Sequence, residues 1–264
     1  MDWRTRKQLT ILLIVFGVVF GALFWIGYSI LHSPGSCTDN KKNQGEEEAD
    51  CGGPCAPCAF KHQRPVEVFF ARFIPVRPTN YDIVAQVQNP NDHLAATPLV
   101  YRVRLYDDKN AEVGRRDNVT FLDPNDRIYV IESNFVTERT VVRAVAEILP
   151  GETKWQFTNE LRPDLTVGKK NYDVVMIDDR EQSRVTAELV NRAAFTFRQV
   201  NVRVALLDES RNIIGVAKTI IANVRPGEPR PIEITWPGKF EGSVARIDME
   251  ARTNWLDSSN ILSP

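Results

Sequence analysis

Four blocks of sequence recur in the second half of the chain, and this repetition limits the fold more than any other feature. In order, residues 83–92, 101–114, 121–126 and 127–135 resemble residues 185–194, 202–215, 223–228 and 229–237. Asp107 and Asp208 lie 101 positions apart, and Pro124 and Pro226 lie 102 apart. A nearly constant offset across four blocks predicts two copies of one domain.

Both copies alternate apolar and polar residues with the period of a β-strand. Residues 101–105 read Tyr-Arg-Val-Arg-Leu, and apolar residues occupy every second position from Val200 to Leu206. This period predicts half-buried strands, and the Asp- and Asn-containing stretches 107–110 and 208–212 predict hairpin turns. We therefore expect a mainly β fold of two tandem antiparallel β-sandwiches. Their expected spans are residues 61–158 and 159–264.

One block of the repeat resembles a known family signature. Leu105-Tyr106-Asp107, and more loosely Leu206-Leu207-Asp208, are each followed by a glycine, at Gly114 and Gly215. This pattern is similar to that of the FxLYD family and of the related water-stress (WHy) domains. The resemblance implies an immunoglobulin-like sandwich for each copy, and it implies little about activity because a fold does not determine function.

An uncharged run of 21 residues, residues 11–31, precedes the repeat. As a helix that rises 1.5 Å per residue, it would be about 31 Å long, which is enough to cross the hydrocarbon core of a membrane. We expect one transmembrane helix over residues 10–32 that acts as an uncleaved signal-anchor. A cleaved signal peptide is the alternative, but its apolar core is normally shorter and ends at small residues.

The residues that flank this run predict its orientation. Arg4, Arg6 and Lys7 precede the apolar run, whereas Trp25 and Tyr28 fall near its other end. Basic residues favour the cytoplasmic side, and aromatic rings settle at the membrane interface. We therefore expect residues 1–9 to form a cytoplasmic tail and the domains after the helix to lie outside the cell membrane.

The pair Gly17 and Gly21 has the spacing that lets two membrane helices approach closely. Glycine is also frequent in membrane helices that do not associate. A homodimer through the transmembrane helix is therefore one candidate partner arrangement.

Four cysteines, Cys37, Cys51, Cys55 and Cys58, are the only cysteines of the chain. Outside the membrane, four cysteines in so short a segment predict two disulfides, and three pairings are compatible with the sequence. Residues 33–60 are too few to build a hydrophobic core, so we expect the disulfides to hold this neck together.

The neck resembles a short motif of bacterial surface and secreted proteins, C-x-D-x-x-x-N-x-x-E-x-x-x-D-C-G-G-x-C-x-x-C. The acidic and amide positions of this motif are Asp39, Asn43, Glu46 and Asp50. The resemblance implies an extracytoplasmic location more than an activity.

Three chemical roles compete with a purely structural neck. Asp39, Asn43, Glu46 and Asp50 are candidate calcium ligands, and we expect binding no tighter than about millimolar, as in extracellular modules. Four thiolates would suit zinc, and Cys55-Ala-Pro-Cys58 would suit disulfide exchange. An oxidising compartment disfavours zinc, and the absence of a strand-to-helix setting disfavours exchange.

Charge and residue usage argue against several classes of function. The chain has 33 basic and 34 acidic residues, so it lacks the basic surplus that a nucleic-acid-binding protein needs. Its three histidines, His32, His62 and His93, are far apart in sequence. The carboxylate pairs 107–108 and 178–179 fall where turns are predicted. We expect no catalytic residues, no nucleic-acid partner and no cofactor apart from calcium.

These observations predict a non-enzymatic binding or structural protein that presents two β-sandwiches at the cell surface or envelope. The expected partners are the lipid bilayer and an envelope protein or polysaccharide. A component of an envelope assembly or secretion complex is the first alternative. A redox-active envelope protein that uses the C-x-x-C pair is the second.

Overall fold

The structure is a computed structural model that describes residues 3–31 and 36–262, and the chain divides into two compact units, Met1–Lys61 and His62–Pro264. Two helices, α1 (Trp3–Leu31) and α2 (Cys58–Lys61), belong to the first unit. The second unit is built from antiparallel strands. The expectation of a mainly β chain behind an apolar helix is therefore confirmed.

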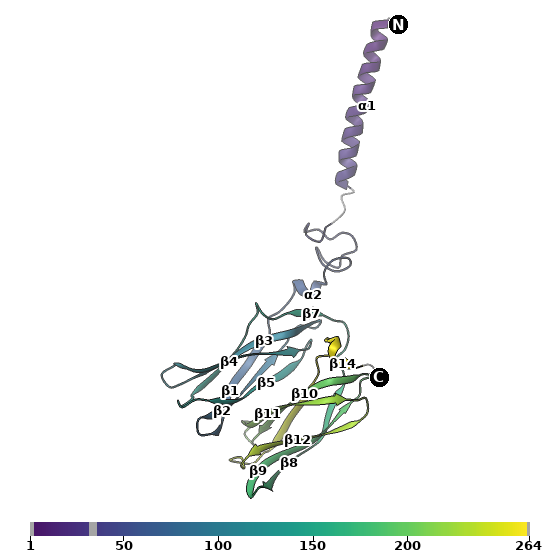
Figure 1. The fold of residues 1–264 in the computed structure, drawn as a ribbon. Coiled ribbons are helices and arrows are strands. Elements are labelled where there is room, and N and C mark those ends of the chain that lie inside the picture. The colour runs from purple at the N-terminus through teal and green to yellow at the C-terminus, as the bar shows by residue number, and fades with distance from the viewer. Residues whose placement is uncertain (1–2, 32–35, 263–264) are drawn as a thin grey trace. The chain divides into compact units, whose positions relative to one another are not determined.

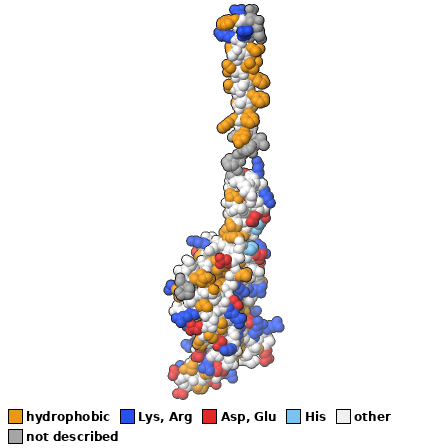
Figure 2. Space-filling view, turned by 90° about the vertical axis from the view of Figure 1, so that its right-hand side faces the viewer, with side chains coloured by type: hydrophobic (Ala, Val, Ile, Leu, Met, Phe, Trp, Pro, Cys, Tyr) orange, Lys and Arg blue, Asp and Glu red, His pale blue; other side chains and the backbone are white. Residues whose placement is uncertain are grey.

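Helix α1 contains the segment Arg6–Tyr28, which has a mean hydropathy of 2.7 and is long and apolar enough to cross a membrane. Hydrophobic side chains cover the face of α1 that Figure 2 shows, and Lys and Arg side chains gather at its N-terminal end. The helix is apolar around its circumference, as expected for a segment surrounded by lipid and not for an amphipathic surface helix.

The strands of the second unit have the following bounds. They are β1 (Glu67–Arg77), β2 (Asn80–Gln88), β3 (Leu94–Tyr106), β4 (Glu112–Leu122), β5 (Arg127–Val136), β6 (Arg143–Ile148), β7 (Trp155–Phe157), β8 (Leu165–Ile177), β9 (Arg180–Asn191), β10 (Thr196–Leu207), β11 (Ile213–Val224), β12 (Pro229–Pro237), β13 (Arg246–Arg252) and β14 (Ile261–Leu262). A short 3-10 turn, η1 (Ser258–Asn260), precedes β14.

Strands β1–β7 form a first sandwich and strands β8–β14 form a second (Figure 1). In the first, a sheet of order β1-β2-β5 faces a sheet of order β4-β3-β6, with β7 added to β3. In the second, β8-β9-β12 faces β11-β10-β13, with β14 added to β10. Each strand of the first sandwich thus has a counterpart in the second.

Each sandwich encloses its own hydrophobic core. Ile83, Leu105 and Ile128 are fully buried between the sheets of the first sandwich. Leu189, Val204 and Ile232 hold the same place in the second. These residues occupy alternate positions of their strands, and that alternation is why the strands were recognisable in the sequence.

A third hydrophobic cluster joins the two sandwiches. Ile74, Val84 and Ile131 of the β1-β2-β5 sheet pack against Ala205 and Val216 of the β11-β10-β13 sheet. Strands β2 and β10 are therefore buried on both faces, whereas their sequence pattern predicted burial of one face. The reason is that one face of each strand packs on the core of its own sandwich, and the other face packs on the neighbouring sandwich.

Candidate functional site

Charged side chains surround the hydrophobic contact between the sandwiches. Salt bridges across this contact join Lys218 to Glu132 and Arg252 to Asp126. Backbone and side chain also meet here, since the Tyr129 amide donates a 2.9 Å hydrogen bond to the Glu250 carboxylate. The contact between the sandwiches therefore combines an apolar cluster with salt bridges and a hydrogen bond between particular residues.

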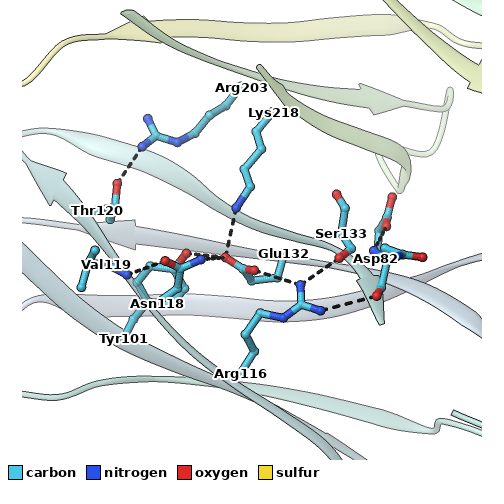
Figure 3. Close-up of polar contacts among 11 residues, drawn as sticks. Asp82, Tyr101, Arg116, Asn118, Val119, Thr120, Glu132, Ser133, Arg203 and Lys218 are labelled. Atoms are coloured by element: carbon cyan, nitrogen blue, oxygen red, sulfur yellow. Dashed lines mark hydrogen bonds and ion pairs between the residues drawn. The ribbon is translucent and has the colours of Figure 1, made fainter. Parts of the chain in front are cut away.

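Glu132 of β5 is the centre of the first polar group, and only 2% of it is exposed. Its carboxylate accepts hydrogen bonds from the Tyr101 hydroxyl at 2.6 Å and from the Asn118 amide at 2.9 Å. Lys218 and Arg116 each reach it at 3.1 Å, from two sides (Figure 3). Both oxygens of this buried carboxylate thus accept hydrogen bonds, three at Oε1 and one at Oε2.

These contacts hold Glu132 in its charged form. Burial acts to raise the pKa of Glu132, but the Tyr101 hydrogen bond and the charge of Lys218 outweigh burial, and the pKa lies below its ordinary value. Burial and the Glu132 carboxylate together raise the pKa of the Tyr101 phenol. Tyr101 therefore stays a hydrogen-bond donor at all physiological pH values.

Arg203 of β10 is a buried cation on the other side of this group, with 6% exposure. Its Nη2 donates to the Thr120 hydroxyl of the first sandwich at 2.9 Å. Its Nη1 is buried and has no hydrogen-bond partner among the described residues, and the Glu250 carboxylate lies 3.8 Å from it. Burial lowers the pKa of this guanidinium, which still remains protonated, as arginine does in proteins.

A cleft of about 450 Å³ opens beside these side chains. It is lined by Tyr101, Asn118 and Thr120 from the first sandwich and by Asn201, Arg203 and Lys218 from the second. Pockets that hold small molecules typically have volumes of about 300–1,000 Å³. The cleft presents two cations together with hydroxyl and amide groups. Groups of these kinds can bind a small polar anion.

Asp126 is the centre of a second polar group, in the loop between β4 and β5. Arg252 donates to it at 2.6 and 2.8 Å, and Arg162 from the segment between the sandwiches binds the same carboxylate. Burial acts to raise the pKa of Asp126, but these two arginines outweigh burial and lower it. At neighbouring Asp123, burial and the charge of Asp126 outweigh the charges of Arg252 and Arg162, and the pKa is raised to about 6.

The structure pairs the four cysteines as Cys37–Cys55 and Cys51–Cys58. The two disulfides predicted for the neck are therefore present, and their pairing is one of the three that the sequence left open. Cys55 and Cys58 bond to different partners, so this C-x-x-C pair does not form a disulfide of its own. Carboxylates of Glu46 and Glu48 lie beside the sulfurs, but disulfide sulfurs lack the thiolate charge that binds zinc.

The three carboxylates among the candidate calcium ligands accept hydrogen bonds from the neck's own groups, whereas the Asn43 side chain donates one. Both Asp50 oxygens accept from the Asn40 amide at 3.0 Å. Glu46 is buried and accepts from the amides of Asn43 and Asp50 at 3.2 Å. Asp39 accepts from the Asn43 side chain at 2.8 Å. These carboxylates therefore stabilise a segment with little hydrophobic core, and their binding of calcium stays a prediction.

The predicted membrane-contacting residues all lie on α1. Arg4, Arg6, Lys7, Trp25 and Tyr28 are exposed in this chain. The Lys7 ammonium lies 4.9 Å from the centre of the Trp3 ring. At Gly17 and Gly21, a Cβ atom would meet no atom of the described part of the chain within 4 Å. The surface around both glycines is thus open to a partner helix or to lipid.

The cleft residues were missed from the sequence, although one signal was present. Arg203 interrupts the apolar segment 200–207 at a position where a half-buried strand places a solvent-facing residue. Nothing local indicates that this face is covered by the other sandwich. Models of known protein families and the curated proteins were compared with the chain, and neither comparison finds a match.

Proposed function

We propose that this chain is a membrane-anchored, extracytoplasmic binding protein without catalytic activity. Helix α1 would hold it in the cell membrane with its N-terminus in the cytoplasm, and the second unit would face the outside. The observation that carries this proposal is helix α1, whose residues 11–31 are uncharged and whose N-terminal end carries Arg4, Arg6 and Lys7. The two disulfides of the neck add support because disulfides persist mainly outside the cytoplasm.

A binding role fits the second unit better than a structural spacer does. The sandwiches contact each other through apolar and polar groups, and the cleft between them is lined by side chains from both. A structural spacer needs two folded domains but no defined contact between them. A ligand site needs its binding groups held in fixed positions. We infer that the FxLYD-like sandwiches serve here as a binding module of a bacterial cell envelope.

Labelling of a new cysteine tests the orientation. Ser210→Cys places a thiol on the exposed turn between β10 and β11, and a membrane-impermeant maleimide is added to intact cells. We expect labelling without permeabilisation. Labelling only after the membrane is opened would place the second unit in the cytoplasm and overturn the proposal. The native chain is the matched control, since both native cysteine pairs are in disulfides.

Membership of an envelope assembly or secretion complex is the second candidate function. The open surface at Gly17 and Gly21 supports it, because a partner helix could pack closely there. Cross-linking in native membranes, followed by mass spectrometry of the purified chain, distinguishes the candidates. Cross-links from α1 to another membrane protein would favour the assembly role. Recovery of the chain alone, or only with itself, would favour a free binding module.

A further inference from the structure

Equivalent positions of the two sandwiches carry different charge pairs. In the first, Arg102 of β3 lies opposite Asp117 of β4, and two hydrogen bonds of 2.6 Å join them. In the second, the residue opposite Arg203 of β10 is Lys218 of β11. Both pairs have the same place in the repeat, 101 positions apart. The second sandwich thus has a cation where the first has the neutralising acid.

Two like charges directly opposite each other in an antiparallel pair destabilise the sheet. Lys218 is compensated by Glu132 of the first sandwich, 3.1 Å away. Glu132 is also shared with Arg116. Arg203 has only the Glu250 carboxylate at 3.8 Å, beyond hydrogen-bond distance. On β11 the position opposite Arg203 therefore supplies no compensating charge, and on β13 the opposite residue is this same Glu250.

The two cations that line the cleft are each incompletely compensated. Lys218 shares the Glu132 carboxylate with Arg116. The buried Nη1 of Arg203 has no hydrogen-bond partner among the described residues. A negative charge in the cleft would give both cations a partner.

We propose that the cleft between the sandwiches binds the carboxylate group of a small polar molecule, of the size and chemistry of a sugar acid. Arg203 and Lys218 would hold the carboxylate, and the side chains of Asn118, Thr120 and Asn201 would bind its hydroxyl groups. Figure 3 shows Arg203 and Lys218 extending toward the strands that carry Tyr101, Asn118 and Thr120. This inference deepens the proposed function, since it names the ligand class of that binding module.

A carboxylate fits this site better than a dianion does. One negative charge would pair with Arg203 and Lys218, whereas a second would lie beside Glu132 and Glu250 without a cation of its own, and a partly buried unpaired charge is costly. The planar guanidinium fork also matches a planar carboxylate. The cleft volume of about 450 Å³ accommodates a molecule of this size.

Ligand-observed NMR titration of the full chain in lipid nanodiscs tests this inference. The probes are D-glucuronate, the neutral sugar D-glucose, and sulfate. We expect glucuronate to bind at least tenfold more tightly than glucose or sulfate. Arg203→Met and Lys218→Met should each weaken glucuronate binding about tenfold or more, because a hydrogen bond to a charged group contributes about that factor.

Arg102→Met is the matched control, because it removes the same group at the equivalent position of the first sandwich, outside the cleft. It should leave glucuronate binding unchanged. Removing one partner of a buried charge pair destabilises a fold, so circular dichroism checks that each variant is folded. Lys218, which is 45% exposed at its side chain, provides a second test should Arg203→Met not fold.

Three results would overturn the inference. They are equal binding of glucuronate and glucose, binding of sulfate in preference to glucuronate, and glucuronate binding that neither cleft variant weakens. The titration does not depend on membrane orientation, so its failure would leave the cysteine-labelling result unaffected. A wrong orientation in the labelling experiment would likewise leave the measured affinities intact.

Discussion

Arg252 of the second sandwich binds Asp126 of the first through two charge-assisted hydrogen bonds, of 2.6 and 2.8 Å. Asp126 is 4% exposed, and it also binds Arg162 of the connecting segment. One carboxylate thereby ties together a loop of the first sandwich, the segment between the sandwiches and the last residue of β13. We attribute the fixed contact of the two sandwiches largely to this group and to the apolar cluster beside it.

Removing Arg252 should therefore destabilise the second unit. Arg252→Met leaves Asp126 buried with Arg162 as its remaining partner, and breaking a buried ion pair costs about 3–5 kcal/mol. We expect a loss near the lower end of that range in the free energy of unfolding, measured by urea denaturation. Arg184→Met, which breaks a half-exposed pair with Asp173, should change stability far less. Equal effects of the two variants would contradict a special role for Asp126.

Asp123 should make stability depend on pH. Burial raises its pKa from 3.8 to about 6, so between these values the folded state holds more of its proton than the unfolded state does. Stability from this group is present at low pH and is lost as the pH rises through about 6. Asp126 and Glu132 act in the opposite sense, because their lowered pKa values favour the folded state above their unfolded values.

The variant Asp123→Asn isolates this effect. At neutral pH the raised pKa corresponds to about 3 kcal/mol, since one pKa unit corresponds to about 1.4 kcal/mol. The variant should match the native chain at pH 4 and become progressively more stable than it up to pH 7. Urea denaturation at several pH values measures this difference. A difference that is independent of pH would show that Asp123 has an ordinary pKa.

Local patterns predicted the strands, the turns and the two copies, because each strand alternates core and surface residues over a few positions. They did not predict the contact between the copies. Arg102 and Arg203 occupy equivalent positions in similar sequence, yet the Arg102 side chain is half-buried, with 24% exposed, while Arg203 is 6% exposed and lies beneath the other sandwich. Arg203 is buried by residues about 80 positions away in the sequence, such as Thr120. A pattern of neighbouring residues carries no information about contacts at that separation.

The disulfide pairing illustrates the same limit. Four cysteines predicted two bonds, but their pairing depends on how the chain turns at Gly45, Gly52 and Gly53, which all have positive φ. The candidate calcium ligands were chosen by residue type and spacing, which cannot distinguish a carboxylate that binds a cation from one that binds backbone amides.

The apolar contact between the sandwiches should couple their unfolding. Ile131 is 2% exposed and lies in the cluster between them. Ile131→Ala should cost about 2–5 kcal/mol, as for other buried Ile-to-Ala changes, and thermal unfolding should still show one transition. Ile220→Ala, at a site 55% exposed, should stay within about 0.5 kcal/mol of the native chain. Two separate transitions in the native chain would show that the sandwiches unfold independently.

Gly53 should be essential for the fold of the neck, whereas Gly45 should be less so. Both have positive φ, at 58° and 87°. A Cβ at Gly53 would lie 2.5 Å from the Gly45 carbonyl oxygen, but a Cβ at Gly45 would meet nothing within 4 Å. Gly53→Ala therefore adds a steric clash to the cost of about 1–2 kcal/mol that a side chain bears in the left-handed region. We expect free thiols in this variant and faster tryptic cleavage at Lys41 and Lys42, which are exposed in the neck.

Gly45→Ala is the matched control for this variant, because it bears the backbone strain without the clash. It should retain both disulfides and show only slightly faster cleavage. The unfolding midpoint of the second unit should be unchanged in both variants, since both glycines belong to the first unit. Equal thiol content in the two variants would show that strain alone governs the neck. A lowered midpoint in Gly53→Ala would show that the sandwiches depend on the neck for their stability, contrary to the division into two units.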